Sequence, residues 1–373
     1  MNKKIRIAII THGGIGTGPN GEGMPLLMDI LSLLAEQFDI TVYSLEKFDV
    51  NFFPKKYKIK ATPFKATTKL SIRFLWLSCT IIMHHIIHPY QLFHGYWGFP
   101  GGWLAMMVGK FFKKKTIVSF LGAEVIDLPQ INYGLYTSKN SRKRIEWISK
   151  NADCIIAQSH FHAEKISEAV TVKSLKVIYG GVDTTKFLFI EKEKKIPFQI
   201  LHVANLNAVK DQETLLKAFK LITTKIKAEL HIVGVDTLGG EINNLVKEMD
   251  LSDTVFFYGL LKQEEIIPLY HKANIFLLTS LYESQAVVVN EAMATGTVVC
   301  GTRVGLIADL ENKATLAVDV KDAAGLADKV LKLLNDRALY IQLQQYGLNW
   351  TREYDINHTA KKYTELYVDL VSN

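Results

Sequence analysis

Short apolar runs alternate with longer, helix-compatible segments along most of this chain. In the first half the runs lie at residues 5–11, 40–44, 92–95, 116–120, 154–158 and 176–178. After a charged stretch at 191–195 the pattern restarts, with runs at 199–203, 229–233, 255–258, 275–278, 298–301 and 314–318. Runs of this length are typical of buried strands, and their alternation with helices is typical of parallel sheets covered on both faces. The pattern therefore predicts an α/β protein.

Because the pattern occurs twice, we expect two Rossmann-like, doubly wound domains that face one cleft. The chain has 373 residues, which suits two domains of ordinary size. We place the first domain at residues 1–184 and the second at 185–351, with a polar joint near 184–198. Ligands of such sheets bind at the carboxyl ends of the strands.

The segment 274–309 carries the most specific chemistry. An apolar run at 275–278 predicts a strand, a turn then delivers Glu283, and a helix is expected to begin near Ser284 and to carry Glu291. The amides that open a helix have no partner within it and bind anions such as phosphate. The flanking carboxylates can accept hydrogen bonds from hydroxyls. The arrangement fits a diphosphate with a sugar at one end and a ribose at the other.

This segment resembles the E-x7-E motif of retaining glycosyltransferases of the GT-B fold, the family four type. The match consists of Glu283, Glu291 and the following residues 292–296, AMATG. A bare pair of glutamates is weak evidence, since acidic residues are favoured at any helix start; the strands on both sides favour the functional interpretation. The resemblance implies a catalytic role for Glu283, ribose binding by Glu291 and diphosphate binding by the amides of Ser284, Gln285, Ala286 and Val287.

Two further segments of the second half resemble the same family. Residues 201–211, LHVANLNAVKD, are similar to its strand-end G-R-L-x-x-x-K-G, which aims a cation at the diphosphate. Lys210 matches the family lysine, whereas Asn205 replaces an arginine and carries no charge. Either Lys210 alone binds the negative charge of the diphosphate, or another cation also binds it, with Arg303 as the candidate. Residues 257–261 match F-x-G, which implies that Leu260 lines the base pocket.

In the first half the resemblance concerns the acceptor side or the cleft. Gly13 and Gly14 match a glycine-rich loop that faces donor and acceptor, with a purely structural turn as the alternative. A dinucleotide fingerprint is not met, because Pro19 stands where the third glycine is needed. The resemblance also implies that the last segment, 352–373, crosses back onto the first domain.

Two more segments of the first half resemble the family. His94 opens a segment similar to H-x-H-x-x-x-P-G, and Gly122 and Glu124 belong to one similar to T-x-H-G-x-D. The histidine that contacts the donor sugar in the family is Leu121 here. Leucine offers no hydrogen bond, so this position bears on donor choice and on turnover.

Charge is distributed unevenly. The net charge is +7, with 24 Lys/Arg against 13 Asp/Glu in residues 1–190 and 20 against 24 in the remainder. A basic front half suits an anionic membrane or a lipid diphosphate, and a solvated basic face is the alternative. No nucleic-acid-binding motif is recognised, so we expect no nucleic acid as a partner.

Other features limit the location and the cofactors. No uninterrupted apolar run of about 18 residues occurs, so no spanning helix is expected. The first run is short and contains Arg6, so we expect no secretion. Three scattered cysteines suit a reducing compartment. His84, His85 and His88 lie in an apolar, helix-like stretch without acidic residues, which favours packing or a membrane-facing segment over a metal site.

These features lead to one function and two alternatives. We expect a cytoplasmic retaining glycosyltransferase that moves a sugar from a nucleotide-diphosphate donor to a glycan or lipid-linked glycan. A location at the inner face of the membrane is the alternative to a freely diffusing enzyme. No metal or other cofactor is expected. The alternatives are a sugar-nucleotide epimerase of the same fold and a nucleotide-sugar-binding subunit that has lost turnover.

Overall fold

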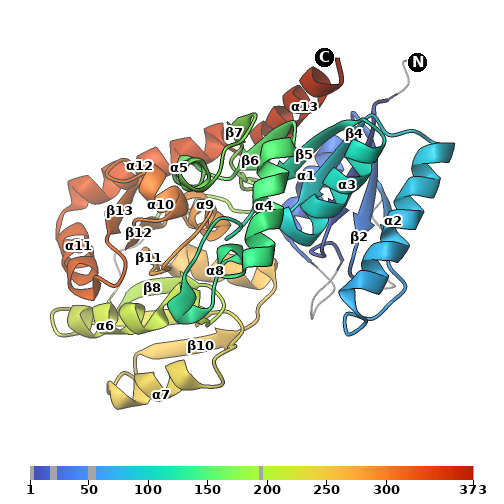
Figure 1. Ribbon diagram of the computed structural model, residues 1–373. Helices are drawn as coiled ribbons and strands as arrows, with labels where there is room; N and C mark the ends of the chain where they lie inside the picture. The colour runs from blue at the N-terminus through green and yellow to red at the C-terminus, as the bar shows by residue number, and fades with distance from the viewer. Residues whose placement is uncertain (1–3, 17–22, 49–55, 193–195, 373) are drawn as a thin grey trace. The chain divides into compact units, whose positions relative to one another are not determined.

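A computed structural model describes residues 4–16, 23–48, 56–192 and 196–372. Its contacts divide the chain into two compact units, residues 1–180 with 356–373 and residues 181–355. Figure 1 shows the elements of both. Each predicted apolar run forms a strand.

Unit 1 contains a parallel sheet with the strand order β3-β2-β1-β4-β5-β6-β7. Its strands are β1 (Arg6–Thr11), β2 (Asp39–Ser44), β3 (Lys58–Ala61), β4 (Leu92–Tyr96), β5 (Lys115–Ser119), β6 (Cys154–Ala157) and β7 (Leu175–Val177). The pattern did not predict β3, a half-exposed edge strand of sequence KIKA. Its alternating lysines resemble a basic surface segment, and it gains its strand structure by pairing with β2.

The helices of unit 1 connect these strands. They are α1 (Pro25–Leu34), α2 (Leu70–Ile87), α3 (Trp103–Phe111), α4 (Lys139–Asn151), α5 (His160–Ala169) and α13 (Ile356–Ser372), with helical turns η1 (Gly98–Gly102), η2 (Pro129–Ile131) and η3 (Leu135–Thr137). The last helix, α13, packs on α1 and places Ile356, Tyr363 and Tyr367 in the core of this unit. The predicted return of the C-terminal segment to the first domain is thus confirmed.

Unit 2 has the strand order β10-β9-β8-β11-β12-β13. The strands are β8 (Phe198–Val203), β9 (Ala228–Val233), β10 (Val255–Gly259), β11 (Ile275–Leu278), β12 (Val298–Thr302) and β13 (Thr315–Val318). The helices are η4 (Ala208–Lys210), α6 (Gln212–Thr223), α7 (Glu241–Glu248), α8 (Gln263–Lys272), α9 (Val287–Ala294), α10 (Gly305–Asp309), α11 (Ala323–Asn335) and α12 (Arg337–Glu353). The order is that of a doubly wound dinucleotide-binding fold, which reverses between β8 and β11.

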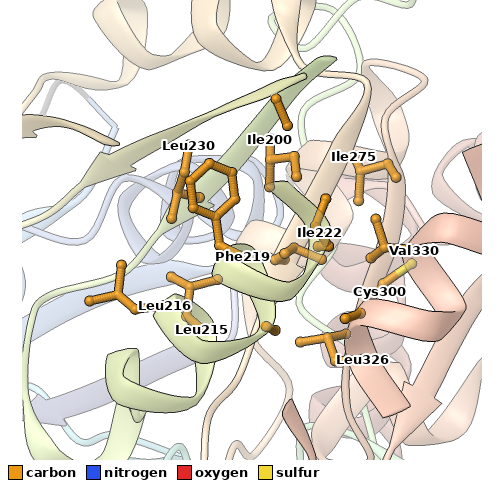
Figure 2. Packing of buried hydrophobic residues seen from close by; sticks show 14 of the residues in the cluster. Ile200, Leu215, Leu216, Phe219, Ile222, Leu230, Ile275, Cys300, Leu326 and Val330 are labelled. Carbon is orange, nitrogen blue, oxygen red and sulfur yellow. The ribbon is translucent and has the colours of Figure 1, made fainter. Parts of the chain in front are cut away.

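The core of unit 2 shows why these elements form. Figure 2 shows Leu215, Phe219 and Ile222 of α6 packed with Ile200 and Leu230 of the sheet. These three α6 residues recur at helical spacing and are fully buried, so one face of the helix covers the strands. The packing holds β8 and β11 side by side and brings the loops at their carboxyl ends together.

Candidate functional site: the carboxyl ends of β8 and β11

The loops that follow β8 and β11 are tied directly to each other. The backbone amide of Leu281 donates to the carbonyl of Val209 at 2.7 Å. The hydroxyl of Thr279 donates to the carbonyls of Lys210 and Asp211, each at 3.0 Å. The two predicted segments of the second half therefore meet where the strand order reverses, the position at which such sheets bind ligands.

Lys210 and Glu283 form an ion pair at this junction. Their side chains are 23% and 12% exposed, so the pair is largely shielded while it still reaches solvent. The hydroxyl of Ser280 donates a second hydrogen bond to the same Glu283 oxygen at 2.6 Å. The ammonium expected to bind the diphosphate and the carboxylate expected to bind the sugar thus lie in contact.

The turn after Glu283 is longer than predicted. The helix α9 begins at Val287, not near Ser284, because Ala286 adopts the left-handed conformation with φ 68° and cannot continue a right-handed helix backwards. Gln285 is buried, whereas Ser284, Ala286 and Val287 are half-buried. The amide of Val289 donates to the carbonyl of Ala286 at 3.0 Å, and the positive end of the helix dipole at this start of α9 suits an anion.

The start of α10 supports this turn from the side. The amide of Leu306 donates to the carbonyl of Gln285 at 2.9 Å. The hydroxyl of Thr302, at the end of β12, donates to the carbonyl of Ser280 at 2.6 Å. Gly305 has φ +53°, and a Cβ there would lie 2.7 Å from the Gln285 carbonyl oxygen. A glycine is therefore required for α10 to approach so closely.

Glu291 lies one turn into α9, on the same side as Val287. The hydroxyl of Tyr270 donates to its carboxyl group at 2.9 Å. Burial raises the pKa of Glu291 to about 7, and the hydrogen bond from Tyr270 acts in the opposite direction. The carboxyl group can therefore change its protonation near neutral pH.

Three other residues that were predicted to bind the sugar donor make no contact with the Lys210–Glu283 pair in the interactions described. Arg303 binds the two Glu311 oxygens at 2.7 and 2.9 Å and also binds Asp319. Its guanidinium is held by these carboxylates and is not joined to the Lys210–Glu283 pair, which corrects the expectation that it substitutes for the missing cation. The side chain of Asn205 accepts the amide of Val235 at 3.0 Å, and Leu260 is 46% exposed just after β10.

In unit 1, Gly13 and Gly14 follow β1, where the order of that sheet also reverses. Gly14 has φ +81°, and its carbonyl accepts the amide of Met24 at 2.7 Å. A Cβ on Gly13 would collide with the carboxylate of Glu46. Gly14 is thus demanded by the left-handed turn, whereas the contact at Gly13 is with the end of a side chain that can move. Residues 17–19 of the same loop lie outside the described residues.

His94 is fully buried, which contradicts its predicted place in a cleft. Its Nδ1 lies 2.7 Å from the Tyr367 hydroxyl, and its Nε2 lies 2.8 Å from the Ser119 hydroxyl. Burial lowers the pKa of His94 to about 3, so the ring is neutral. His94 therefore joins the sheet of unit 1 to α13.

Glu124 is also buried, with 2% of its surface exposed. Its carboxylate accepts the amides of Gly98 and Leu121, each at 3.1 Å, and of Gly122 at 2.8 Å. Burial raises the pKa of this carboxyl group. Glu124 thus connects two loops of unit 1, and its carboxylate is occupied by backbone amides. Leu121 and Gly122 are half-buried.

The contacts add two residues to those predicted, Ser280 and Tyr270. Ser280 precedes Glu283 by three residues in the same loop, which is a weak signal that the sequence did contain. Tyr270 lies on a different helix, 21 positions before Glu291, and no pattern links the two. Within the described residues, no group of three or more His, Cys, Asp or Glu is arranged to hold a metal ion.

The two doubly wound units together have the GT-B fold. The sequence model of the family Glycosyl transferases group 1 matches residues 183–350, which are slightly less than half of the chain. The match covers most of unit 2, including both loops of the site.

Two curated relatives are similar to this chain in sequence. N-acetyl-alpha-D-glucosaminyl L-malate synthase of Bacillus anthracis is 27% identical over 237 residues, which cover 60% of this chain and 61% of that protein. D-inositol 3-phosphate glycosyltransferase of Corynebacterium jeikeium is 28% identical over 246 residues, covering 60% and 59%. The chain thus matches about three-fifths of the length of these relatives.

Solved structures share the fold over nearly the whole chain. Sucrose-phosphate synthase from Thermosynechococcus elongatus superposes with a TM-score of 0.82 at 21% identity, covering 99% of this chain and all of that one. Anabaena Alr3699/HepE in complex with UDP-glucose superposes with a TM-score of 0.75 at 16% identity, covering 98% and 100%.

Proposed function

We propose that this chain is a retaining glycosyltransferase of the family four type that transfers a sugar, of the hexose class, from a nucleotide diphosphate. One observation carries the proposal: Lys210 and Glu283, which are 73 positions apart in sequence, form an ion pair beside the first turn of α9. An ammonium, a carboxylate and the amides at the start of α9 match the three parts of such a donor. The names of the curated relatives and the UDP-glucose of the Anabaena chain support this assignment.

The chemistry assigns each group a role. The amides at the start of α9 and the ammonium of Lys210 bind the diphosphate, on which negative charge develops as its bond to the sugar breaks. Glu283 then accepts hydrogen bonds from sugar hydroxyls, and Glu291 accepts them from the ribose. An acceptor oxygen forms the new bond on the same face of the sugar, and its proton passes to the departing phosphate oxygen. No metal is needed in this scheme, because Lys210 and the helix supply the positive charge.

We assign the acceptor to the glycans and lipid-linked glycans of polysaccharide biosynthesis. The excess of Lys and Arg in residues 1–190 supports an anionic partner. A cytoplasmic enzyme that contacts the inner face of an anionic membrane fits such an acceptor. Nucleic acid is not among the proposed partners.

A second candidate is a nucleotide-sugar-binding subunit without turnover. Leu121 and Asn205 replace a histidine and an arginine of the family pattern, and the Asn205 side-chain oxygen is engaged by the amide of Val235. Two polar contacts with a donor are thereby absent, which favours binding without chemistry.

One experiment separates these candidates. The purified full chain is incubated with individual nucleotide sugars and a glycan or lipid-linked acceptor, and released nucleoside diphosphate and glycoside product are measured. We expect both products from the wild type, background release from Glu283→Ala, and wild-type release from Glu213→Ala, an exposed acidic residue on α6. If wild type and Glu283→Ala both release only background amounts while both bind the nucleotide, the chain is a binding subunit.

A further inference from the structure

The solvent-facing side of α2 is apolar along its whole length. Ile72, Leu75, Met83 and Ile86 are 46%, 67%, 56% and 67% exposed, and the exposed Cys79 lies between them. These positions are three or four residues apart, so they form one stripe on the helix. An apolar stripe of this length on a surface helix marks an interaction site.

No charged side chain interrupts this stripe. The single Lys or Arg of α2 is Arg73, which is buried and donates to the carbonyls of Thr68 and Leu45 at 3.1 and 3.2 Å. The opposite side of α2 packs on β2 and α3, with Leu77, Ile81 and His85 buried there. The helix is 18 residues long with a mean hydropathy of 1.5, enough by length and composition to cross a membrane, and 28% of it is buried.

The end of α3 lies next to the end of α2. The ring of His85, near the end of α2, lies 4.2 Å from the ring of Phe112, just after α3. The two helix ends are therefore adjacent, and Phe111 and Ile87 are 74% and 67% exposed there. We name the exposed residues Ile72, Leu75, Met83, Ile86, Ile87 and Phe111 the α2–α3 patch.

Positive charge surrounds the α2–α3 patch. Residues 50–123 contain 11 Lys and Arg and no Asp or Glu. Lys65 and Lys69 precede α2, while Lys110 and Lys113 flank Phe111, and all four are exposed. An apolar helix face with a basic border is the pattern of a helix that lies in the plane of an anionic membrane interface.

We propose that the α2–α3 patch docks unit 1 onto an anionic lipid bilayer, with α2 lying in the interface and the bordering lysines contacting lipid headgroups. The inference gives a specific surface to the membrane contact in the proposed function. A second copy of the chain is disfavoured as the occupant, because two such patches would bring like charges together with no acidic residue from this region to offset them.

Co-sedimentation of the full chain with vesicles tests the proposal. One set of vesicles contains phosphatidylglycerol and phosphatidylcholine, and the other contains phosphatidylcholine alone. We expect binding to the first set, little binding to the second, and loss of binding as salt rises. The double variant Ile86→Ser, Phe111→Ser should abolish it, and Lys110→Glu with Lys113→Glu should lower the partition coefficient by more than about fivefold per residue.

Matched controls keep the result interpretable. Leu221→Ser changes a side chain that is 43% exposed in unit 2, and Lys217→Glu changes an exposed lysine of α6; both should bind vesicles like the wild type. Circular dichroism checks that each variant is folded. Equal binding to both vesicle types, no binding to either, or unaltered binding of the patch variants would overturn the proposal.

Two further readouts separate the alternatives. Sedimentation velocity detects a dimer, and a dimer that Ile86→Ser dissociates would assign the patch to a second copy and overturn the lipid proposal. Nucleoside diphosphate release with a water-soluble acceptor reports the proposed function by itself. A wild-type chain that binds no vesicles but shows full release defeats only the docking inference, whereas a wild-type chain that binds vesicles without release defeats only the proposed function.

Discussion

At the scale of single residues, the ion pair between Lys210 and Glu283 determines what the site can bind. The pair is largely shielded from solvent, and leaving either charge buried without a partner is costly. A ligand that separates the two must therefore offer an anion to Lys210 and hydroxyl donors to Glu283. A diphosphate sugar does both, so we propose that the pair selects this kind of ligand.

Replacing the lysine tests its part in the chemistry. We expect Lys210→Met to lower the rate of nucleoside diphosphate release by about 10²–10³, because a preorganised charge that meets the departing group is lost. Donor affinity should fall less than the rate, since the largest effect occurs in the transition state. Steady-state kinetics measure both, with Lys217→Met as the control on α6. Equal rates for the two variants would contradict the assignment.

The protonation of Glu291 makes donor binding depend on pH. Because burial raises its pKa to about 7, the carboxyl group is protonated at lower pH and accepts hydrogen bonds from ribose hydroxyls less well. Donor affinity, measured by calorimetry, should therefore rise as pH increases through about 7 in the wild type. In Glu291→Gln it should be weaker and without this dependence. A wild-type affinity that is flat across the same range would refute this.

The same pKa shift has the opposite consequence for the unliganded fold. The folded chain holds the Glu291 proton more tightly than the unfolded chain, for which the pKa is near 4.5. The contribution of this group to the free energy of unfolding is therefore largest below a pH of about 4.5, and it declines as the pH rises towards about 7. Burial of this carboxyl group therefore lowers the free energy of unfolding at neutral pH, which is consistent with a role in binding rather than in stability.

At the scale of elements, the turn between β11 and α9 is held from two sides. Within the turn, Thr279 and Leu281 donate hydrogen bonds to the loop that follows β8. From the other side, Leu306 of α10 donates a hydrogen bond to the turn. Both contacts join segments that are far apart in sequence. The position of the α9 amides therefore depends on how β8, β11 and β12 pack side by side. The left-handed Ala286 then sets where that helix begins.

Gly305 offers a test of this support. Gly305→Ala introduces a Cβ 2.7 Å from a backbone oxygen in addition to left-handed strain, so the free energy of unfolding should fall by more than the approximately 1–2 kcal/mol that strain alone costs. Gly239→Ala is the matched control, since Gly239 has φ +64° and nothing within 4 Å of the added carbon. Denaturant unfolding measures both. Equal destabilisation would show that the close approach carries no energy.

At the scale of the whole molecule, the donor and acceptor predictions fall in different units. Lys210, Glu283 and Glu291 belong to unit 2, which also contains the family match. The basic sequence and the α2–α3 patch belong to unit 1. This separation suits a protein that binds a soluble donor with one unit and attaches to an anionic surface with the other.

A nucleotide panel tests the donor assignment for the intact chain. A matching nucleoside diphosphate sugar at 100 times its dissociation constant should stabilise the folded state by about 2.7 kcal/mol, which thermal shift detects. Hydrogen exchange should slow in residues 204–211 and 279–289 of unit 2, where the ligand is expected to bind. Protection confined to unit 1 would argue against the donor site.

Sequence periodicity was sufficient for much of this fold, because burial imposes its pattern locally. A strand enclosed on both faces must be largely apolar, which made most of the strands visible as runs; the edge strands β7 and β10 are partly exposed but are also apolar enough to be found. The loop chemistry around Glu283 and Lys210 was visible for a related reason, since each motif follows a strand end within a few residues. The exposed edge strand β3 and the left-handed Ala286 were missed, because pairing and packing determine their conformations and leave little local signal.

The sequence alone therefore determined three things: the alternation of strands and helices, their division into two halves, and the residue types at the strand ends. Only the tertiary structure decided which of those residues can face a ligand. It buried His94 against α13, engaged Glu124 with backbone amides and paired Arg303 with two carboxylates, while it brought Lys210 to Glu283. The physical reason is that burial and charge pairing depend on partners far apart in the chain, which periodicity cannot specify.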